Sequence, residues 1–400
     1  MKKIILSTIL FLTISLLNAQ CPTSGISLTT QTQIDNFSAT YPSCSNILGN
    51  LSIQGNTITN LNGLLSIISI NGTLNINNCP NLTTLQGLNN VININITFIS
   101  NCSNLLNLNG LNNLTNTNLS FTNIPNLSSI SALSNLTTCN YININNCDSL
   151  ININGLEGLT NTETLEIRNN SLLQNIEGLT NLTNVQNTVQ IVANTNLQNL
   201  NGLNSLITLG YYLDISNNPS LNSIAGLINV TQMNNITDPI NDNCGILIGT
   251  NINLSSLNGL DNVNILVANN YFNLSIYNNS ILTNGSVASV CNYLNAGKQN
   301  NITSNSTGCN SSTEILANCQ NLSNSEFSTN SILIFPNPTK NILNINSKFN
   351  SIKIFDNLGR QMNFEKINEN QISIQYLPKG IYILEVISEN KKTSKKIIKE

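Results

Sequence analysis

Apolar residues recur along most of this chain with a period of about 23 residues. Each repeat carries a Leu-x-Gly-Leu motif, and an apolar Leu-x-Ile pair follows about a dozen residues later. The motif glycines, one of them replaced by alanine, are Gly63, Gly87, Gly110, Ala132, Gly155, Gly178, Gly202, Gly226 and Gly259. A fixed period of roughly 20 to 50 residues is typical of a solenoid, whose turns bury their apolar edges against one another. Such proteins usually bind rather than catalyse.

The Leu-x-Ile pairs align into ten candidate turns. They are Leu51/Ile53, Leu74/Ile76, Thr97/Ile99, Leu119/Phe121, Ile142/Ile144, Leu165/Ile167, Val189/Ile191, Leu213/Ile215, Ile246/Ile248 and Leu274/Ile276. Alternation with period two predicts short strands with both side chains facing inward, stacked into one parallel sheet. Apolar residues three apart follow each strand and fill the core from the other side. Their spacing fits an extended segment and a short helical turn equally well. The motif glycine supplies a tight bend or a close approach of two backbones.

Asparagine is unusually abundant, with 84 residues in 400. Six of them follow successive strands at one repeat position: Asn78, Asn101, Asn123, Asn146, Asn169 and Asn217. Asparagine tolerates left-handed backbone geometry, and stacked asparagines can form a ladder of amides. We therefore interpret these six as residues that form the corners of the turns, in preference to residues that contact a ligand.

Both ends of the repeat region show helix signals, as expected for caps over an exposed core. Thr30 to Ala39 carries Ile34 and Phe37 at helical spacing. A second stretch begins at Ser286 and ends before Gly297. Both segments are predicted to be capping helices.

The repeat unit resembles the leucine-rich repeat and, more closely, the receptor L-domain type of solenoid, over about residues 25 to 320. The resemblance implies a right-handed parallel β-solenoid. Most turns read Asn-x-x-Leu after the strand, as in Asn218 to Leu221, instead of the standard Asn-x-Leu. This departure favours a straighter stack over a horseshoe.

The first residues are typical of a secretory signal peptide, with Lys2-Lys3 before an apolar stretch and Ala19 before Gln20. We expect cleavage after Ala19; a lipoprotein anchored at Cys21 is the alternative. No other apolar run approaches the roughly 18 residues of a membrane span, so no transmembrane segment is expected in the mature chain.

Export places the ten cysteines in an oxidising compartment, where disulfides form. Pairing Cys21 with Cys44 and Cys309 with Cys319 would staple the two ends of the solenoid. Cys79 and Cys102 occupy one repeat position in successive turns, within reach of each other, and form either a disulfide or two buried thiols. The chain has no histidine and no CxxC pair, so we expect no metal site and no cofactor.

The charge balance and the hydrophobic pattern both change near residue 330. Residues 21 to 330 carry two basic and 12 acidic residues, whereas residues 331 to 400 carry 11 basic and six acidic ones. Short alternating strands with turn signals between them predict a small antiparallel β-sandwich after the solenoid. The predicted divisions are 1–19 signal peptide, 20–48 N-terminal cap, 49–280 repeat solenoid, 281–320 C-terminal cap, 321–330 linker and 331–400 C-terminal domain.

Four ordered motifs in the last seventy residues resemble the type IX secretion C-terminal sorting domain. The residues that carry the resemblance are Pro336, Asn337, Pro338, Gly359, Gly380, Tyr382, Lys395 and Lys396. It implies passage through the periplasm, recognition by the type IX secretion machinery, and a secreted protein on the outer-membrane surface or in the extracellular space. The basic tail Lys391 to Lys399 also suits an edge strand protected by charge.

The candidate binding surface is the outward face of the stacked strands, whose residues alternate with the core pairs. The named candidates are Asn75, Phe98, Asn143, Glu166, Arg168, Gln190, Asp214 and Tyr277. Amides and hydroxyls near an aromatic ring suit glycans, whereas protein partners more often contact clustered aromatic and Arg anchors. The ligand class therefore stays open between protein and glycan. Nucleic acid is disfavoured because the body is acidic.

We expect an exported, non-catalytic interaction or adhesion module and not an enzyme, since no phosphate loop or nucleophile elbow is present. A structural surface-coat protein, or a solvated sheet face without a ligand, is the main alternative. A carboxylate-based polysaccharide hydrolase using Glu166 is a weaker one, because adjacent turns offer no second acidic residue in register with it.

Overall fold

A computed structural model describes residues 21–233, 244–265, 272–324, 334–345, 349–356, 359–388 and 391–400. The chain divides into two compact units, Met1–Gln320 and Asn321–Glu400, which we describe separately. The predicted signal peptide lies outside the described residues.

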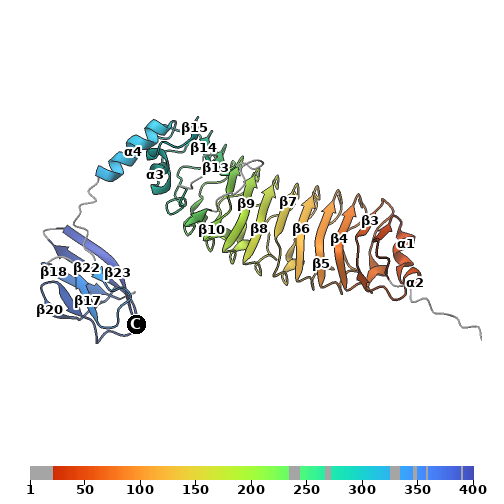
Figure 1. The fold of residues 1–400 in the computed structure, drawn as a ribbon, viewed down its shortest axis with the longest axis horizontal. Helices are drawn as coiled ribbons and strands as arrows, with labels where there is room; N and C mark the ends of the chain where they lie inside the picture. The colour runs from red at the N-terminus through yellow and green to blue at the C-terminus, as the bar shows by residue number, and fades with distance from the viewer. Residues whose placement is uncertain are drawn as a thin grey trace, which may run out of the picture. The chain divides into compact units, whose positions relative to one another are not determined.

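The first unit is built on one long sheet of 15 strands (Figure 1). Its main path follows β1 (Ile26–Leu28), β3 (Leu51–Gln54), β4 (Ser69–Asn77), β5 (Asn93–Ser100), β6 (Asn116–Thr122), β7 (Tyr141–Asn145), β8 (Asn161–Arg168), β9 (Asn184–Val192), β11 (Tyr212–Ser216), β13 (Cys244–Gly249), β14 (Phe272–Tyr277) and β15 (Asn300–Thr303). Three short strands, β2 (Asn46–Ile47), β10 (Thr208–Leu209) and β12 (Gln232–Met233), pair beside this path. Neighbours run parallel, so the predicted β-solenoid is confirmed.

The strand register is the one that the Leu-x-Ile alignment predicts. Leu51 pairs with Leu74, Leu165 with Val189 and Ile246 with Leu274. These inward side chains are almost completely buried. The stack is longer than the ten predicted turns, because β1 precedes Leu51 and β15 follows Leu274.

Short 3-10 helices lie across the core from several strands: η1 (Asn62–Leu64), η2 (Ser131–Leu133), η3 (Glu177–Leu179), η4 (Asn201–Leu203) and η5 (Ala225–Leu227). In these turns the apolar period of three is therefore helical. Each motif glycine lies against the backbone of a preceding turn. A Cβ atom on Gly202 would lie 1.8 Å from the carbonyl oxygen of Ile176. The close approach of two backbones is thus the reason for glycine.

The six predicted corner asparagines all adopt positive φ, between 52° and 57°. The Asn146 side chain donates to Asn123 Oδ1 at 2.8 Å, and Asn123 donates to Asn101 Oδ1 at 3.1 Å. The interpretation of these residues as corner-formers is confirmed.

A second asparagine ladder begins one residue after the corner, and all its members except the last, Asn305, are fully buried. Its members are Asn170, Asn194, Asn218, Asn251, Asn279 and Asn305. In each step, a backbone N–H donates to the amide oxygen of the next ladder residue, as from Asn194 to Asn218 at 2.9 Å. The side-chain amide in turn donates to a strand carbonyl, as from Asn218 to Ile191 at 2.8 Å. The ladder therefore pairs backbone groups that the corner would leave buried without partners.

Cysteine occupies the same ladder position in earlier turns. Cys79, Cys102 and Cys147 are buried free thiols, and the Cys79 sulfur lies 3.6 Å from the carbonyl oxygen of Ile53. Of the two alternatives for Cys79 and Cys102, the structure shows two thiols. The Cys102 thiol donates to the carbonyl oxygen of Ser100 at 3.3 Å.

Two disulfides close the ends of the solenoid. Cys21–Cys44 is present as expected, with a Cα–Cα distance of 4.7 Å. The predicted Cys309–Cys319 pair is wrong, because Cys319 bonds to Cys291 instead. Cys319 lies on α4 (Ser312–Asn324) and Cys291 on α3 (Ala288–Asn295), and these helices bring their side chains together. Cys309 is a buried thiol.

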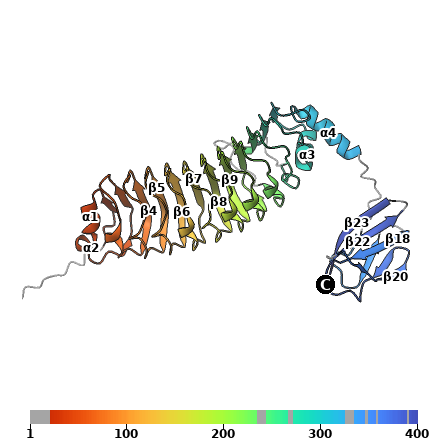
Figure 2. The same cartoon turned by 180° about the vertical axis from the view of Figure 1, so that it is seen from behind.

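The caps form where helix signals predict them, with differences in detail. At the front, α1 (Gln31–Asp35) has a capping box between Thr30 and Gln33, and α2 (Phe37–Thr40) follows. At the back, α3 is followed by the unpredicted α4, which extends into residues 321–324 of the expected linker. Figure 2 shows α3 and α4 beyond the last solenoid strands.

The second unit contains two four-stranded antiparallel sheets, as the predicted sandwich requires. One has the order β16 (Ile334–Phe335), β17 (Ile342–Ile345), β21 (Gln371–Ser373), β20 (Glu365–Asn368). The other has the order β19 (Gln361–Met362), β18 (Ser351–Phe355), β22 (Gly380–Ser388), β23 (Lys391–Lys399). The basic tail is thus an edge strand.

Candidate functional site

The outward face of the solenoid sheet holds all eight predicted binding residues. Strand pairing places Glu166 opposite Asn143 and Gln190, and Gln190 opposite Asp214. Asn75 pairs with Phe98 at the other end of the same row. The row crosses the solenoid strand by strand, so adjacent members lie roughly 4.8 Å apart at the backbone.

Four side chains on β7, β8 and β9 form a connected polar group, here called the Arg168 cluster. Arg168 forms an ion pair with Glu166 and donates to Gln190 Oε1 at 2.9 Å. The Tyr141 hydroxyl donates to Glu166 Oε2 at 3.3 Å. Burial raises the pKa of Tyr141, and the nearby Glu166 carboxylate raises it further. Three strands thereby fix one guanidinium group on an otherwise weakly charged face.

Asp214 lies two strands from Glu166 in the same row, with Gln190 between them. The Tyr212 hydroxyl donates to Asp214 Oδ2 at 3.4 Å. Burial raises the pKa of Asp214, while hydrogen bonds from Ser216 and Tyr212 lower it. Burial and the adjacent carboxylate raise the pKa of Tyr212 to about 12. The carboxylate of Asp214 therefore occupies a less favourable environment than it would in water.

Buried polar atoms without hydrogen-bond partners gather on this face. Among the described residues they are Asn75 Oδ1, Asn143 Oδ1, Arg168 Nε, Asp214 Oδ1 and Asn273 Oδ1, and one further atom, Ser289 Oγ, lies elsewhere. Native structures pair most buried polar atoms, and each exception needs an explanation such as a ligand or a water molecule. Four of the five atoms are acceptors, so this face suits ligands that donate hydrogen bonds.

The two predicted aromatic residues lie apart from the Arg168 cluster. Phe98 is half-buried on β5. Tyr277 is half-buried on β14, and its ring covers Gly249, where a Cβ atom would lie 2.6 Å from the ring. The prediction omitted Tyr141, Tyr212 and Asn273. They precede the inward Leu or Ile by one residue, so extending the alternation one step back would have found them.

In the second unit, the predicted motif residues hold the C-terminal strand in place. Asn337 donates to the Lys396 carbonyl oxygen at 2.9 Å and accepts from the Ile398 N–H at 2.8 Å. The carbonyl oxygen of Thr339, the next residue of the same motif after Pro338, accepts the Glu400 N–H at 2.9 Å. The Tyr382 hydroxyl donates to the Pro378 carbonyl oxygen at 2.8 Å. Lys395 and Lys396 are exposed on β23.

Two other motif positions shape turns and strand ends. Gly359 adopts a φ of +78° in the turn closed by Asp356 and Arg360, which form an ion pair. Gly380 is the first residue of β22. Pro336 and Pro338 are exposed on either side of Asn337.

Residues 333–400 match the family model of the secretion system C-terminal sorting domain. The C-terminal unit is a type IX sorting domain. The protein is therefore exported by the type IX machinery and is secreted to the cell surface or the extracellular space. No curated protein matches the chain.

The described residues show neither a membrane-spanning helix nor a group of metal ligands. None of their helices is both long and apolar enough to cross a membrane. Their His, Cys, Asp and Glu side chains nowhere form a group of three that could hold a metal ion.

Proposed function

We propose that the solenoid is a non-catalytic interaction or adhesion module on the cell surface, and that its ligand binds the outward face at the Arg168 cluster and Asp214. The unpartnered polar atoms on this face carry the proposal. A ligand rich in hydroxyl or amine donors would pair the free acceptors. The fold itself uses the buried side of the strands, so the outward side chains are available for recognition.

The engagement of the Arg and Tyr side chains by neighbouring carboxylates favours a glycan over a protein. Protein interfaces are enriched in aromatic and Arg residues that gather near the centre. Here Phe98 lies on the distant strand β5. Arg168 is already engaged by Glu166 and Gln190. The Tyr141 and Tyr212 hydroxyls are engaged by Glu166 and Asp214, so these side chains are not free anchors. Hydroxyls, amides and one fixed ion pair suit the many weak hydrogen bonds of a sugar chain.

Binding of the purified secreted protein to glycan and protein arrays tests the proposal. We expect glycan ligands, and we expect Arg168→Ala to weaken their binding by roughly 10- to 150-fold, because a hydrogen bond to a charged group contributes roughly 1.5–3 kcal/mol. Lys298→Ala is the matched control, since Lys298 is the other basic residue of the body and lies outside the outward face.

Three outcomes would redirect the proposal. Failure to bind across both arrays, with an altered surface layer and normal adhesion after gene deletion, would favour a coat protein. Protein ligands alone would refute the preference for glycans. Polysaccharide turnover that is lost in Glu166→Gln would favour a hydrolase, since the register provides Asp214 as a second carboxylate.

A further inference from the structure

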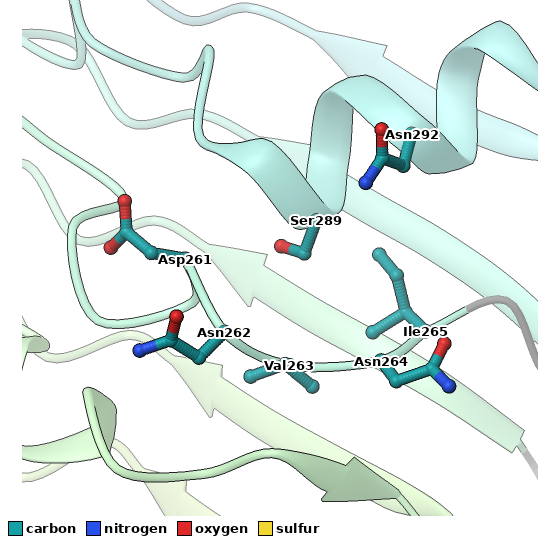
Figure 3. A pocket seen from close by; sticks show the side chains of 7 residues that line it. All are labelled: Asp261, Asn262, Val263, Asn264, Ile265, Ser289 and Asn292. Atoms are coloured by element: carbon teal, nitrogen blue, oxygen red, sulfur yellow. The ribbon is translucent and has the colours of Figure 1, made fainter. Parts of the chain in front are cut away.

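A small cavity lies at the back of the solenoid, away from the outward sheet face. Its volume is about 210 Å³, and Figure 3 shows the seven residues that line it. The loop Asp261–Ile265 forms one wall, and Ser289 and Asn292 of α3 form the other. Ser289 and Asn292 are one helical turn apart, so they occupy the same side of the helix.

Ser289 is the most unusual residue of this cavity. It is only 5% exposed, and its hydroxyl has no hydrogen-bond partner. In Figure 3 the hydroxyl points away from the helix toward the loop that carries Asp261 and Asn262. A buried hydroxyl without a partner costs free energy, which a ligand in the cavity would recover.

The start of α3 adds unpaired donors beside this hydroxyl. The N-cap residue, Val287, has no side chain that could accept a hydrogen bond, and the first helical bond runs from Cys291 N to the Val287 carbonyl oxygen at 2.9 Å. The N–H groups of Ala288, Ser289 and Val290 consequently find no acceptor among the described residues.

The facing loop supplies hydrogen-bond acceptors. Asp261 accepts the Gly259 N–H through Oδ2 at 2.9 Å, so its Oδ1 is left to accept a hydrogen bond from a ligand. Asn262 donates to the Ile228 carbonyl oxygen at 2.8 Å, so its amide oxygen is left for a second contact. Val263 and Ile265 border the cavity but are each 2% exposed, because they belong to the solenoid core.

The chemistry of the walls narrows the ligand class. A helix N-terminus attracts anions, but the Asp261 carboxylate opposes a negative charge here. A divalent metal needs several acidic or imidazole ligands, whereas Asp261 is the single acidic residue of the lining. The volume is below the roughly 300 Å³ of pockets for larger ligands. Interleaved donors and acceptors around a small cavity match a compact neutral molecule that carries several hydroxyls.

We propose that this cavity binds one neutral sugar unit, either a free monosaccharide or a single residue of a glycan. Hydroxyls of the sugar accept from Ser289 and the α3 N–H groups and donate to Asp261 and Asn262. The site is separate from the Arg168 cluster, so its failure would leave the proposed function of the sheet face unaffected.

Ligand-observed NMR with the purified secreted protein tests this site. The probes are glucose, galactose, mannose and N-acetylglucosamine, each also as its methyl glycoside, together with inorganic phosphate. We expect at least one sugar to bind, and both Ser289→Ala and Asp261→Asn to weaken it about tenfold. Asp148→Asn is the matched control, because Asp148 also accepts a backbone N–H but lies outside the cavity.

The variants keep the result interpretable. Ser289→Ala removes a hydroxyl that has no partner, so we expect its melting temperature to equal or exceed that of the wild type. Equal binding of the free sugar and its glycoside would identify a glycan residue as the occupant, whereas binding of the free sugar alone would identify a monosaccharide; both support the site. Absence of sugar binding, binding unchanged in both variants, or tighter binding of phosphate than of any sugar would overturn it.

Discussion

The buried asparagine ladder gives a quantitative test of what holds the solenoid together. Asn218 is completely buried, accepts the Asn194 N–H at 2.9 Å, and donates to the Ile191 carbonyl oxygen at 2.8 Å. Asn218→Ala would leave both backbone groups without these partners inside the core. Each unpaired group costs about 1–3 kcal/mol, so we expect a loss of roughly 2–6 kcal/mol in the free energy of unfolding.

Urea unfolding measured by circular dichroism would report this loss, and hydrogen exchange at the Asn194 amide would locate it. Asn218→Cys should cost less than Asn218→Ala, because Cys79 and Cys102 fill the same position in other turns. Asn222→Ala is the control: this side chain is exposed, so the expected change is within about 0.5 kcal/mol. If Asn218→Ala were as stable as Asn222→Ala, the ladder would not be stabilising.

Two further predictions concern single positions. Gly202→Ala should destabilise the protein by about 1–3 kcal/mol, because the new Cβ would lie 1.8 Å from the Ile176 carbonyl oxygen. An unchanged melting temperature would contradict the close packing of adjacent turns. Burial raises the pKa of the Asp214 carboxyl above its ordinary 3.8, so the folded state binds the carboxyl proton more tightly than the unfolded state does. The free energy of unfolding therefore falls as pH rises from about 3.8 through the raised pKa. Asp214→Asn should therefore be more stable than the wild type near pH 7 and show no gain near pH 3, and a less stable variant near pH 7 would show that the carboxylate is compensated.

The strand register was predictable because a period of two determines which side chains face inward. The buried ladder was not, since its members are six among 84 asparagines and cysteine replaces them in earlier turns. Helix α4 was missed although Ser311 and Glu314 have capping-box spacing, and Glu314 N–H does bond to Ser311 Oγ at 3.2 Å. Because α4 was not predicted, Cys319 was paired with Cys309, which is nearer in sequence than the true partner Cys291.

The candidate site was predictable as a face but not as a set of contacts. Alternation identified Glu166, Arg168, Gln190 and Asp214 as members of the outward rows. Which of them meet depends on side-chain conformation, and the contact of Tyr141 with Glu166 arises from an outward position that the alignment omitted. The cavity beside Ser289 depends on how α3 packs against a distant loop, which no local pattern encodes.

The scarcity of charge in the solenoid makes its few charged contacts informative. Stacked turns place equivalent residues about 4.8 Å apart, where like charges repel, so a repeated scaffold position favours neutral side chains. Asparagine meets this need, because one amide both donates and accepts along the ladder. Glu166, Arg168 and Asp214 contribute nothing to that ladder, and Asp214 occupies an environment that disfavours its charge. Their positions on β8 and β11 therefore support the recognition role proposed for the outward face.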